Sequence, residues 1–312
     1  MVDINNNNNN NNPLSELIRE QGVVLFDSAM GSALMALNFS TVLRSERVNA
    51  RHPEAVTAIH RQNIEAGSDI ITTNTFGISA LLSEEVRGGD FAEGQSLVSW
   101  AIGCARAAVR KGPVLVALDI GPTGKLIELS DDLTHEEAYR IFAAQAKIGA
   151  AAGADLILIE TMADLEELKD AVSAAKASCD LPVICTMTFE KSGRTYMGAD
   201  PVSFVKEAEA LGATAVGVNC TLAPDEIADV VRTIAEATSL PVIAQPNASQ
   251  PVMRDGKQYY SITPPVFAAD AALLADAGAS LLGGCCGTTP AAIALLDDIL
   301  TANGKRKEHK PR

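Results

Sequence analysis

Two adjacent cysteines, Cys285 and Cys286, lie in the run Gly-Gly-Cys-Cys-Gly, and their thiols could form a disulfide or bind a metal ion. Neighbouring Cα atoms are about 3.8 Å apart, which is too close for an unstrained disulfide, so the pair is better suited to binding a soft metal ion. A third sulfur is available at Cys220, in the run Val-Gly-Val-Asn-Cys. Three thiolates favour zinc or another soft metal and leave one tetrahedral position open, as catalytic sites do.

The remaining cysteines and the histidines carry no comparable pattern. Cys104, Cys179 and Cys185 are predicted to be structural, because cysteine is commonly buried as a small apolar residue. The four histidines cluster neither with one another nor with the cysteines. His60 lies on an apolar helical stretch and is expected in the core.

The elements that must position these thiols are eight short apolar runs, each followed by a helix-like stretch. Strands that alternate with helices predict a parallel sheet, and eight of them close a single (β/α)8 TIM barrel. An open doubly wound sheet is the alternative, and the lack of a Gly-x-Gly-x-x-Gly motif disfavours it. The runs are 23–26, 69–73, 114–118, 156–159, 183–186, 215–218, 242–244 and 280–282.

Polar residues close these runs, at the end where barrel enzymes carry their active sites. Cys220 closes the sixth run, and the cysteine pair follows the eighth. One strand lies between those two in a closed barrel, so we expect the three thiols to converge. The polar residues are Asp27, Asn74, Asp119, Glu160, Thr188, Asn219 with Cys220, Gln245 to Asn247, and Cys285 with Cys286.

A weak repeat precedes every second predicted strand, which suggests a unit built from pairs of strands and helices. Its glycines are expected to end helices in the left-handed conformation. They are Gly67, Gly153, Gly212 and Gly278.

Composition narrows the class of protein. The chain has 312 residues and a net charge of −14, which argues against nucleic-acid binding. It contains no apolar run long enough for a membrane span and no secretory signal, so we expect a cytoplasmic enzyme with reduced cysteines. We assign the barrel to 13–302, between a low-complexity leader (1–12) and a basic tail (303–312) that is expected to be solvated.

Eight motifs lie at or near the ends of the predicted strands. They are Asp27-Ser-Ala-Met-Gly-Ser, Thr73-Asn-Thr-Phe-Gly, Asp119-Ile-Gly-Pro-Thr-Gly, Ile159-Glu-Thr-Met-Ala-Asp, Met187-Thr-Phe-Glu-Lys-Ser-Gly-Arg-Thr, Val218-Asn-Cys, Gln245-Pro-Asn-Ala and Gly283-Gly-Cys-Cys-Gly-Thr-Thr-Pro. Together they resemble the homocysteine S-methyltransferase family, in particular the homocysteine-binding barrel of cobalamin-dependent methionine synthase. The resemblance runs from about residue 23 to residue 300, and the Asn-Cys and Gly-Gly-Cys-Cys-Gly-Thr motifs are the most specific part of it.

The resemblance implies a (β/α)8 barrel in which three thiolates bind zinc, and zinc takes the homocysteine sulfur as a further ligand. It implies roles for particular residues of this chain. The implied metal ligands are Cys220, Cys285 and Cys286; the implied substrate contacts are Asp27 and Glu160 for the amino-acid end, the backbone near Ser28 and Ala29 for the carboxylate, and Asn247 near the metal.

The implied reaction transfers a methyl group to the homocysteine thiol and forms methionine. The expected donor is a methylated corrinoid protein or a methyltetrahydrofolate-linked donor, with methylcobalamin carried by a separate protein or domain. In methionine synthase, folate and cobalamin domains follow this barrel, so we expect either a fragment or a free-standing methyltransferase. An S-methylmethionine or betaine donor, a corrinoid-dependent demethylase and a non-enzymatic zinc-binding module are the alternatives.

The chain departs from the family pattern at four positions near these motifs. Ser28 and Ser249 stand where glycine is usual, Ser32 where threonine is usual, and Gln245 where glutamate is usual. The departures bear on the shape of the substrate pocket and on the identity of the thiol rather than on the metal ligands.

Overall fold

The eight expected strands form one parallel sheet. The computed structural model describes residues 12–39, 44–89, 91–110, 113–127, 133–254 and 257–308. The sheet order is β1-β10-β7-β6-β5-β4-β3-β2, and a bridge between Phe26 and Ile70 brings the two edge strands together, so the sheet is a (β/α)8 barrel and not an open sheet. The strands are β1 (Val24–Leu25), β2 (Ile70–Thr72), β3 (Leu115–Ile120), β4 (Leu156–Met162), β5 (Val183–Met187), β6 (Ala215–Asn219), β7 (Val242–Gln245) and β10 (Leu281–Leu282).

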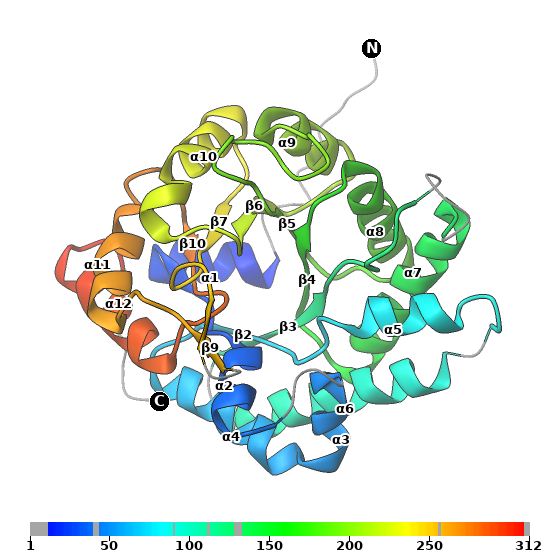
Figure 1. Cartoon of the computed structure of the whole chain (residues 1–312). Coiled ribbons are helices and arrows are strands. Elements are labelled where there is room, and N and C mark those ends of the chain that lie inside the picture. Colours follow the sequence, from blue (N-terminus) through cyan, green and yellow to red (C-terminus); the bar gives the residue numbers. More distant parts are fainter. Residues whose placement is uncertain are drawn as a thin grey trace.

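The helices form a ring around the strands (Figure 1). A short hairpin of β8 (Val252–Arg254) and β9 (Lys257–Tyr259) follows β7. No helix in the described part of the chain is both long and apolar enough to cross a membrane. The helices are α1 (Pro13–Gln21), α2 (Met30–Ala36), the 3-10 helix η3 (Ser45–Arg47), α3 (Val48–Arg51), α4 (Pro53–Glu65), α5 (Ile78–Glu85), α6 (Ala92–Ala108), α7 (His135–Ala152), α8 (Leu165–Ser178), α9 (Pro201–Ala210), α10 (Pro224–Ala237), α11 (Pro264–Leu273) and α12 (Pro290–Ala302).

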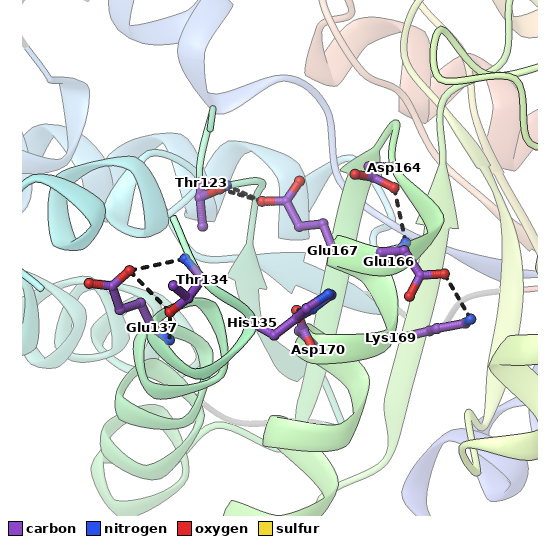
Figure 2. Close-up of polar contacts among 9 residues, drawn as sticks. All are labelled: Thr123, Thr134, His135, Glu137, Asp164, Glu166, Glu167, Lys169 and Asp170. Carbon is purple, nitrogen blue, oxygen red and sulfur yellow. Dashed lines mark hydrogen bonds and ion pairs between the residues drawn. The ribbon is translucent and has the colours of Figure 1, made fainter. Parts of the chain in front are cut away.

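Local sequence fixes where helices begin and end. Helix α7 starts with a capping box, in which the Thr134 hydroxyl accepts the Glu137 N–H and the Glu137 carboxylate accepts the Thr134 N–H (Figure 2). It ends at Gly153, whose φ is 103°. The other three repeat glycines also have positive φ, as predicted: 102° at Gly67, 82° at Gly212 and 109° at Gly278.

Side chains alternate along each strand between the barrel interior and the surrounding helices. On β4, Leu156 and Leu158 belong to the interior cluster, whereas Ile157 and Ile159 pack against helices. Leu14 and Leu17 of α1 join the interior cluster, so α1 covers the end of the barrel where the strands begin. We call that end the closed end, and the opposite end, where the strands finish, the mouth.

The closed end is completed by Arg306, which was predicted to lie in a solvated tail. That prediction is wrong for this residue, because Arg306 is only 3 % exposed. Its guanidinium forms ion pairs with Asp69 and Asp297, the latter at 2.6 Å. It also donates to the carbonyl oxygens of Val23 and Gly67. A charged residue was buried here because it finds a full set of acceptors.

At the other terminus, residues 1–11 of the predicted leader lie outside the described residues. Asn12 belongs to the fold, since its side chain accepts the Ser15 N–H and caps α1. Cys104 and Cys185 are buried, as predicted for structural cysteines, while Cys179 is partly buried at the end of α8. His60 is fully buried, and neither ring nitrogen has a hydrogen-bond partner among the described residues.

Candidate metal centre and substrate pocket

The three predicted metal-binding thiols converge at the mouth. The sulfur atoms of Cys220, Cys285 and Cys286 all lie within 4.8 Å of one another. Cys220 directly follows β6, and two residues separate the end of β10 from the cysteine pair. Only β7 lies between β6 and β10 in the sheet, so the two segments end close together at the mouth. The three residues line one side of a cavity of about 350 Å³.

The backbone at Cys220 is held in an unusual conformation. Cys220 and Thr221 have φ values of 63° and 58°, in the left-handed region that β-carbons disfavour. The Cys220 N–H donates to the Gln245 carbonyl at 3.0 Å, and the Leu222 N–H donates to the Cys220 carbonyl at 2.7 Å. Strain of this kind costs about 1 kcal/mol or more per residue and persists where the surroundings enforce it. Here it turns the Cys220 side chain toward the other two thiols.

The cysteine pair is anchored by main-chain and hydroxyl contacts. The Cys285 N–H donates to the Pro246 carbonyl at 2.8 Å, and the Thr288 hydroxyl donates to the Cys285 carbonyl at 2.7 Å. Gly287 has a φ of 81°, and a β-carbon there would collide with the ring of Tyr260. Glycine is therefore required at this position both by conformation and by the close approach of Tyr260.

This donor set fits zinc. A tetrahedral ion with Zn–S bonds of about 2.3 Å places its sulfur ligands about 3.8 Å apart, and the three sulfur atoms here lie within 4.8 Å of one another. The cluster already favours one thiolate. Hydrogen bonds from Cys285 and Cys286 hold the pKa of Cys220 well below its usual range, and the pKa values of those two thiols are raised in turn.

Glu160 lies beside the cluster because β4 is irregular there. The register of β4 against β5 shifts between Ile159 and Met162, and Thr161 has a φ of 60°. Burial, followed by the charges of Cys220 and Asp27, raises the pKa of Glu160 to about 8.

Asn219 connects Glu160 to the thiols, and no role was predicted for it. Its amide nitrogen donates to Glu160 Oε2 at 3.1 Å and lies 4.0 Å from Cys285 Sγ. Its amide oxygen accepts the Thr161 N–H at 2.9 Å and the Thr186 hydroxyl at 2.7 Å. The amide is thus fixed on both sides, and it holds Glu160 in place. Its position directly before Cys220 was the one signal available in the sequence.

Asp27 also lines the cavity, and it joins two strands. Its Oδ2 accepts the Thr72 N–H of β2 at 2.8 Å, which links the end of β1 to β2. Burial raises the pKa of Asp27 to about 7, although the hydrogen bonds from Thr72 act against this.

The other predicted substrate contacts are Ser28, Ala29 and Asn247, and each of them already has a hydrogen-bond partner within the protein. The N–H groups of Ser28 and Ala29 already donate, to Asn63 Oδ1 at 2.9 Å and to Thr288 Oγ1 at 3.1 Å. A substrate carboxylate would have to replace these partners. Asn247 is buried and does not line the cavity; its side chain instead hydrogen-bonds the Cys220 sulfur, which helps to lower the pKa of that thiol.

Two further cavity residues were not predicted as site residues. Asp119 ends β3 and is 4 % exposed. Tyr260 follows the β8–β9 hairpin, and burial raises the pKa of its phenol to about 12. Sequence reasoning placed Asp119 at a strand end without a role, whereas the hairpin that delivers Tyr260 was not foreseen.

The loop that follows Asp119 is tied to helix α8. The Glu167 carboxylate accepts both the N–H and the hydroxyl of Thr123, at 2.7 and 2.5 Å (Figure 2). Glu167 is buried, and burial raises its pKa. The contact fixes the Asp119-Ile-Gly-Pro-Thr-Gly segment at the rim of the mouth.

Fold and site together define a (β/α)8 barrel enzyme with a cluster of three cysteine thiols at its mouth. The family model for homocysteine S-methyltransferase matches residues 24–300, and the chain belongs to that family. It is 32 % identical to methionine synthase of Mycobacterium tuberculosis over 94 % of the chain, and 30 % identical to that of Mycobacterium leprae over 92 %. The chain spans about a quarter (26 %) of the length of both relatives.

A solved structure is similar over nearly its whole length. The metallated form of the homocysteine methyltransferase MmuM from Escherichia coli superposes with a TM-score of 0.77 and 26 % identity, covering 91 % of this chain and 99 % of MmuM. The oxidized form of MmuM gives 0.79.

Proposed function

We propose that this chain binds zinc through Cys220, Cys285 and Cys286 and transfers a methyl group to the thiol of homocysteine, forming methionine. The observation that carries the proposal is the convergence of three thiols at the edge of a cavity lined by carboxylates. Family membership supports the acceptor, and the name of the metallated MmuM structure supports a metal-dependent site.

The residues of the chain divide the work between the two ends of the substrate. Zinc, when bound, would lower the pKa of a thiol that joins the three cysteines, so that this thiol is ionised near neutral pH. Asp27 and Glu160 would hold the substrate ammonium, and the segment around Ser28 and Ala29 would face its carboxylate. Holding both ends of the substrate orients the sulfur toward the incoming methyl group.

We further infer that the methyl donor is a methylated corrinoid carried by a separate protein or domain. The relatives named methionine synthase support this donor. A betaine-type donor would require aromatic side chains around its cation. Phe76 and Tyr260 are the aromatic residues among the described residues that line the cavity, whereas Trp100, the one tryptophan of the chain, does not line it. The free thiols are also in keeping with the cytoplasmic location expected from the sequence.

The metal assignment is tested by zinc content and by homocysteine titration of Cys220→Ser. The wild type should bind one zinc per chain and release protons when homocysteine binds, because the bound thiol ionises. Cys220→Ser should lose both properties. Cys179→Ser, which removes a partly buried thiol outside the cluster, is the matched control and should retain both. Full zinc retention in Cys220→Ser would refute the ligand set.

The donor is tested separately with zinc-loaded wild-type protein. Methionine formation should be seen with a methylated corrinoid protein and should be absent with S-methylmethionine or betaine alone. Turnover with either small donor would overturn the corrinoid assignment while leaving the acceptor site intact.

A further inference from the structure

Asp119 is a buried carboxylate that the fold leaves unsatisfied. It is 4 % exposed and lines the cavity, and its Oδ1 has no hydrogen-bond partner among the described residues. An unpaired polar atom in such a position normally costs 1–3 kcal/mol or more, so its retention points to a ligand. Its backbone, by contrast, is firmly held, since the Asp119 N–H donates to the hydroxyl oxygen of Thr73 at 3.1 Å.

Asp119 has carboxylate neighbours and no basic one in this cavity. Burial, and then the charges of Glu160, Glu46 and Asp27, raise its pKa. Among the described residues that line the cavity, none is Lys, Arg or His. The cavity therefore presents several acid groups with no cation supplied by its own wall, and a cationic ligand group would relieve their repulsion.

Each of the neighbouring carboxylates already accepts a hydrogen bond from the protein through one of its oxygens. Asp27 Oδ2 accepts the Thr72 N–H, and Glu160 Oε2 accepts from Asn219. Glu46, the fourth acid of the cavity, is held by the Gly77 N–H at 2.7 Å. Asp119 differs from all three, because its buried Oδ1 has no hydrogen-bond donor among the described residues.

We propose that Asp119 is a third acceptor for the ammonium group of the substrate, so that Asp27, Asp119 and Glu160 receive one N–H each. An ammonium carries three donors, which matches three carboxylates. The inference rests on the proposed homocysteine site. The location of Glu160 agrees with the proposed homocysteine site, because the Asn219 amide lies between Glu160 and the thiol cluster. A ligand whose sulfur joins the thiols can thus bring its amine to the carboxylates.

The proposal makes Asp119 a determinant of specificity for amino-acid thiols. Removing its charge should weaken a ligand that carries an ammonium and spare one that lacks it. The matched ligands are homocysteine and 4-mercaptobutyrate, which has the same chain, thiol and carboxylate without the amine. The ratio of their dissociation constants isolates the ammonium from any general change in the pocket.

The experiment is calorimetric titration of both thiols into zinc-loaded wild type, Asp119→Asn and Glu46→Gln. In Asp119→Asn, homocysteine affinity should fall about 10- to 100-fold, the worth of a charged hydrogen bond, with little change for 4-mercaptobutyrate. Glu46→Gln removes a charge from the same cavity at a side chain that the protein itself satisfies. It should change the ratio by roughly threefold at most, because only the longer-range field is altered.

The outcomes separate this proposal from the proposed function. Absence of homocysteine binding to the wild type would sink the proposed function itself. Normal wild-type binding, with Asp119→Asn weakening both thiols equally or neither, would overturn the role of Asp119 alone. Replacing a buried, unsatisfied acid by its amide should not impair folding, and thermal melting checks this. Asp119→Ala provides a second variant and should alter the ratio in the same direction.

Discussion

The two ends of the barrel both bury carboxylates, but they treat them in opposite ways. At the closed end, Asp69 is fully buried and is paired with Arg306, which also binds Asp297. At the mouth, Asp27 and Asp119 are almost as deeply buried, and no basic residue lines their cavity in the described part of the chain. A buried acid is therefore not in itself a sign of function. The acid that matters for ligand binding is the one to which the fold supplies no cation.

Backbone strain follows the same division. Four non-glycine residues with positive φ lie at the mouth: Thr161 near the end of β4, and Cys220, Thr221 and Ser249 on the loops that follow β6 and β7. Contacts at the closed end are instead regular, such as the Asp69 N–H to Leu25 carbonyl bond of 2.7 Å. The strained backbone at the mouth lowers the stability of the fold while it fixes the side chains of the site, whereas the regular contacts of the closed end add to stability.

Breaking the closed end should have the largest effect on stability. Arg306→Met removes the guanidinium that pairs with the fully buried Asp69 carboxylate, so the variant should lose about 3–5 kcal/mol of unfolding free energy. Chemical denaturation measures this. Arg232→Met, which removes an exposed ion pair with Asp229, is the control and should change by less than about 1 kcal/mol. Equal losses in the two variants would contradict the division between the ends.

The stability contributed by a buried acid of the mouth should change with pH in the opposite direction to that contributed by an acid paired with a cation. The pKa of Asp27 is raised from 3.8 to about 7, so the folded state holds a proton that the unfolded state releases. Unfolding free energy should therefore fall as pH rises between these values. In metal-free protein, the unfolding free energy of Asp27→Asn should exceed that of the wild type by an amount that grows as pH rises through that window, to on the order of 3 kcal/mol.

Denaturation of wild type and Asp27→Asn at a series of pH values measures the effect. Asparagine can still accept the Thr72 N–H, so the seam between β1 and β2 is preserved in the variant. Parallel stability curves for the two proteins between pH 4 and 7 would show that Asp27 is not destabilised in the empty mouth.

The smallest effect should come from Ser249, where the family usually has glycine. Its φ is 98°, and its hydroxyl accepts the Ser261 N–H at 2.9 Å in an exposed setting. Ser249→Gly should stabilise the protein by roughly 0.5–1 kcal/mol, because relief of strain exceeds the loss of an exposed hydrogen bond. Thermal unfolding measures this. Ser249→Ala loses the hydrogen bond and keeps the strain, so it should melt below the wild type.

Much of the fold was predictable because it depends on local pattern. Apolar runs identified all eight strands of the barrel, and the glycines at 67, 153 and 212 marked helix ends correctly, whereas Gly278 has the predicted positive φ but lies five residues beyond the end of α11. Convergence of Cys220 with the cysteine pair followed from the barrel count alone. These predictions needed only the spacing of residue types and the geometry of a closed sheet.

The remainder depended on contacts between distant segments. Asn219 is polar and adjacent to Cys220, but its link to Glu160 exists only because β4 shifts register. Arg306 looked like part of a hydrophilic tail, and its acidic partners lie directly before β2 and on α12. Asp119 was placed at the correct strand end, but its lack of a partner is a property of the folded cavity. Such pairings leave no periodic trace in the sequence.

Arg306 also has a consequence for the order in which the barrel forms. Its guanidinium meets the Val23 carbonyl across 283 positions of sequence and the Asp69 carboxylate across 237. Contacts of such long range form against a large loss of chain entropy and are characteristic of slow folding. Until they form, β1 and β2 present open edges of the kind that pair with other chains. Aggregation during refolding should therefore depend on how quickly this arginine reaches its acceptors.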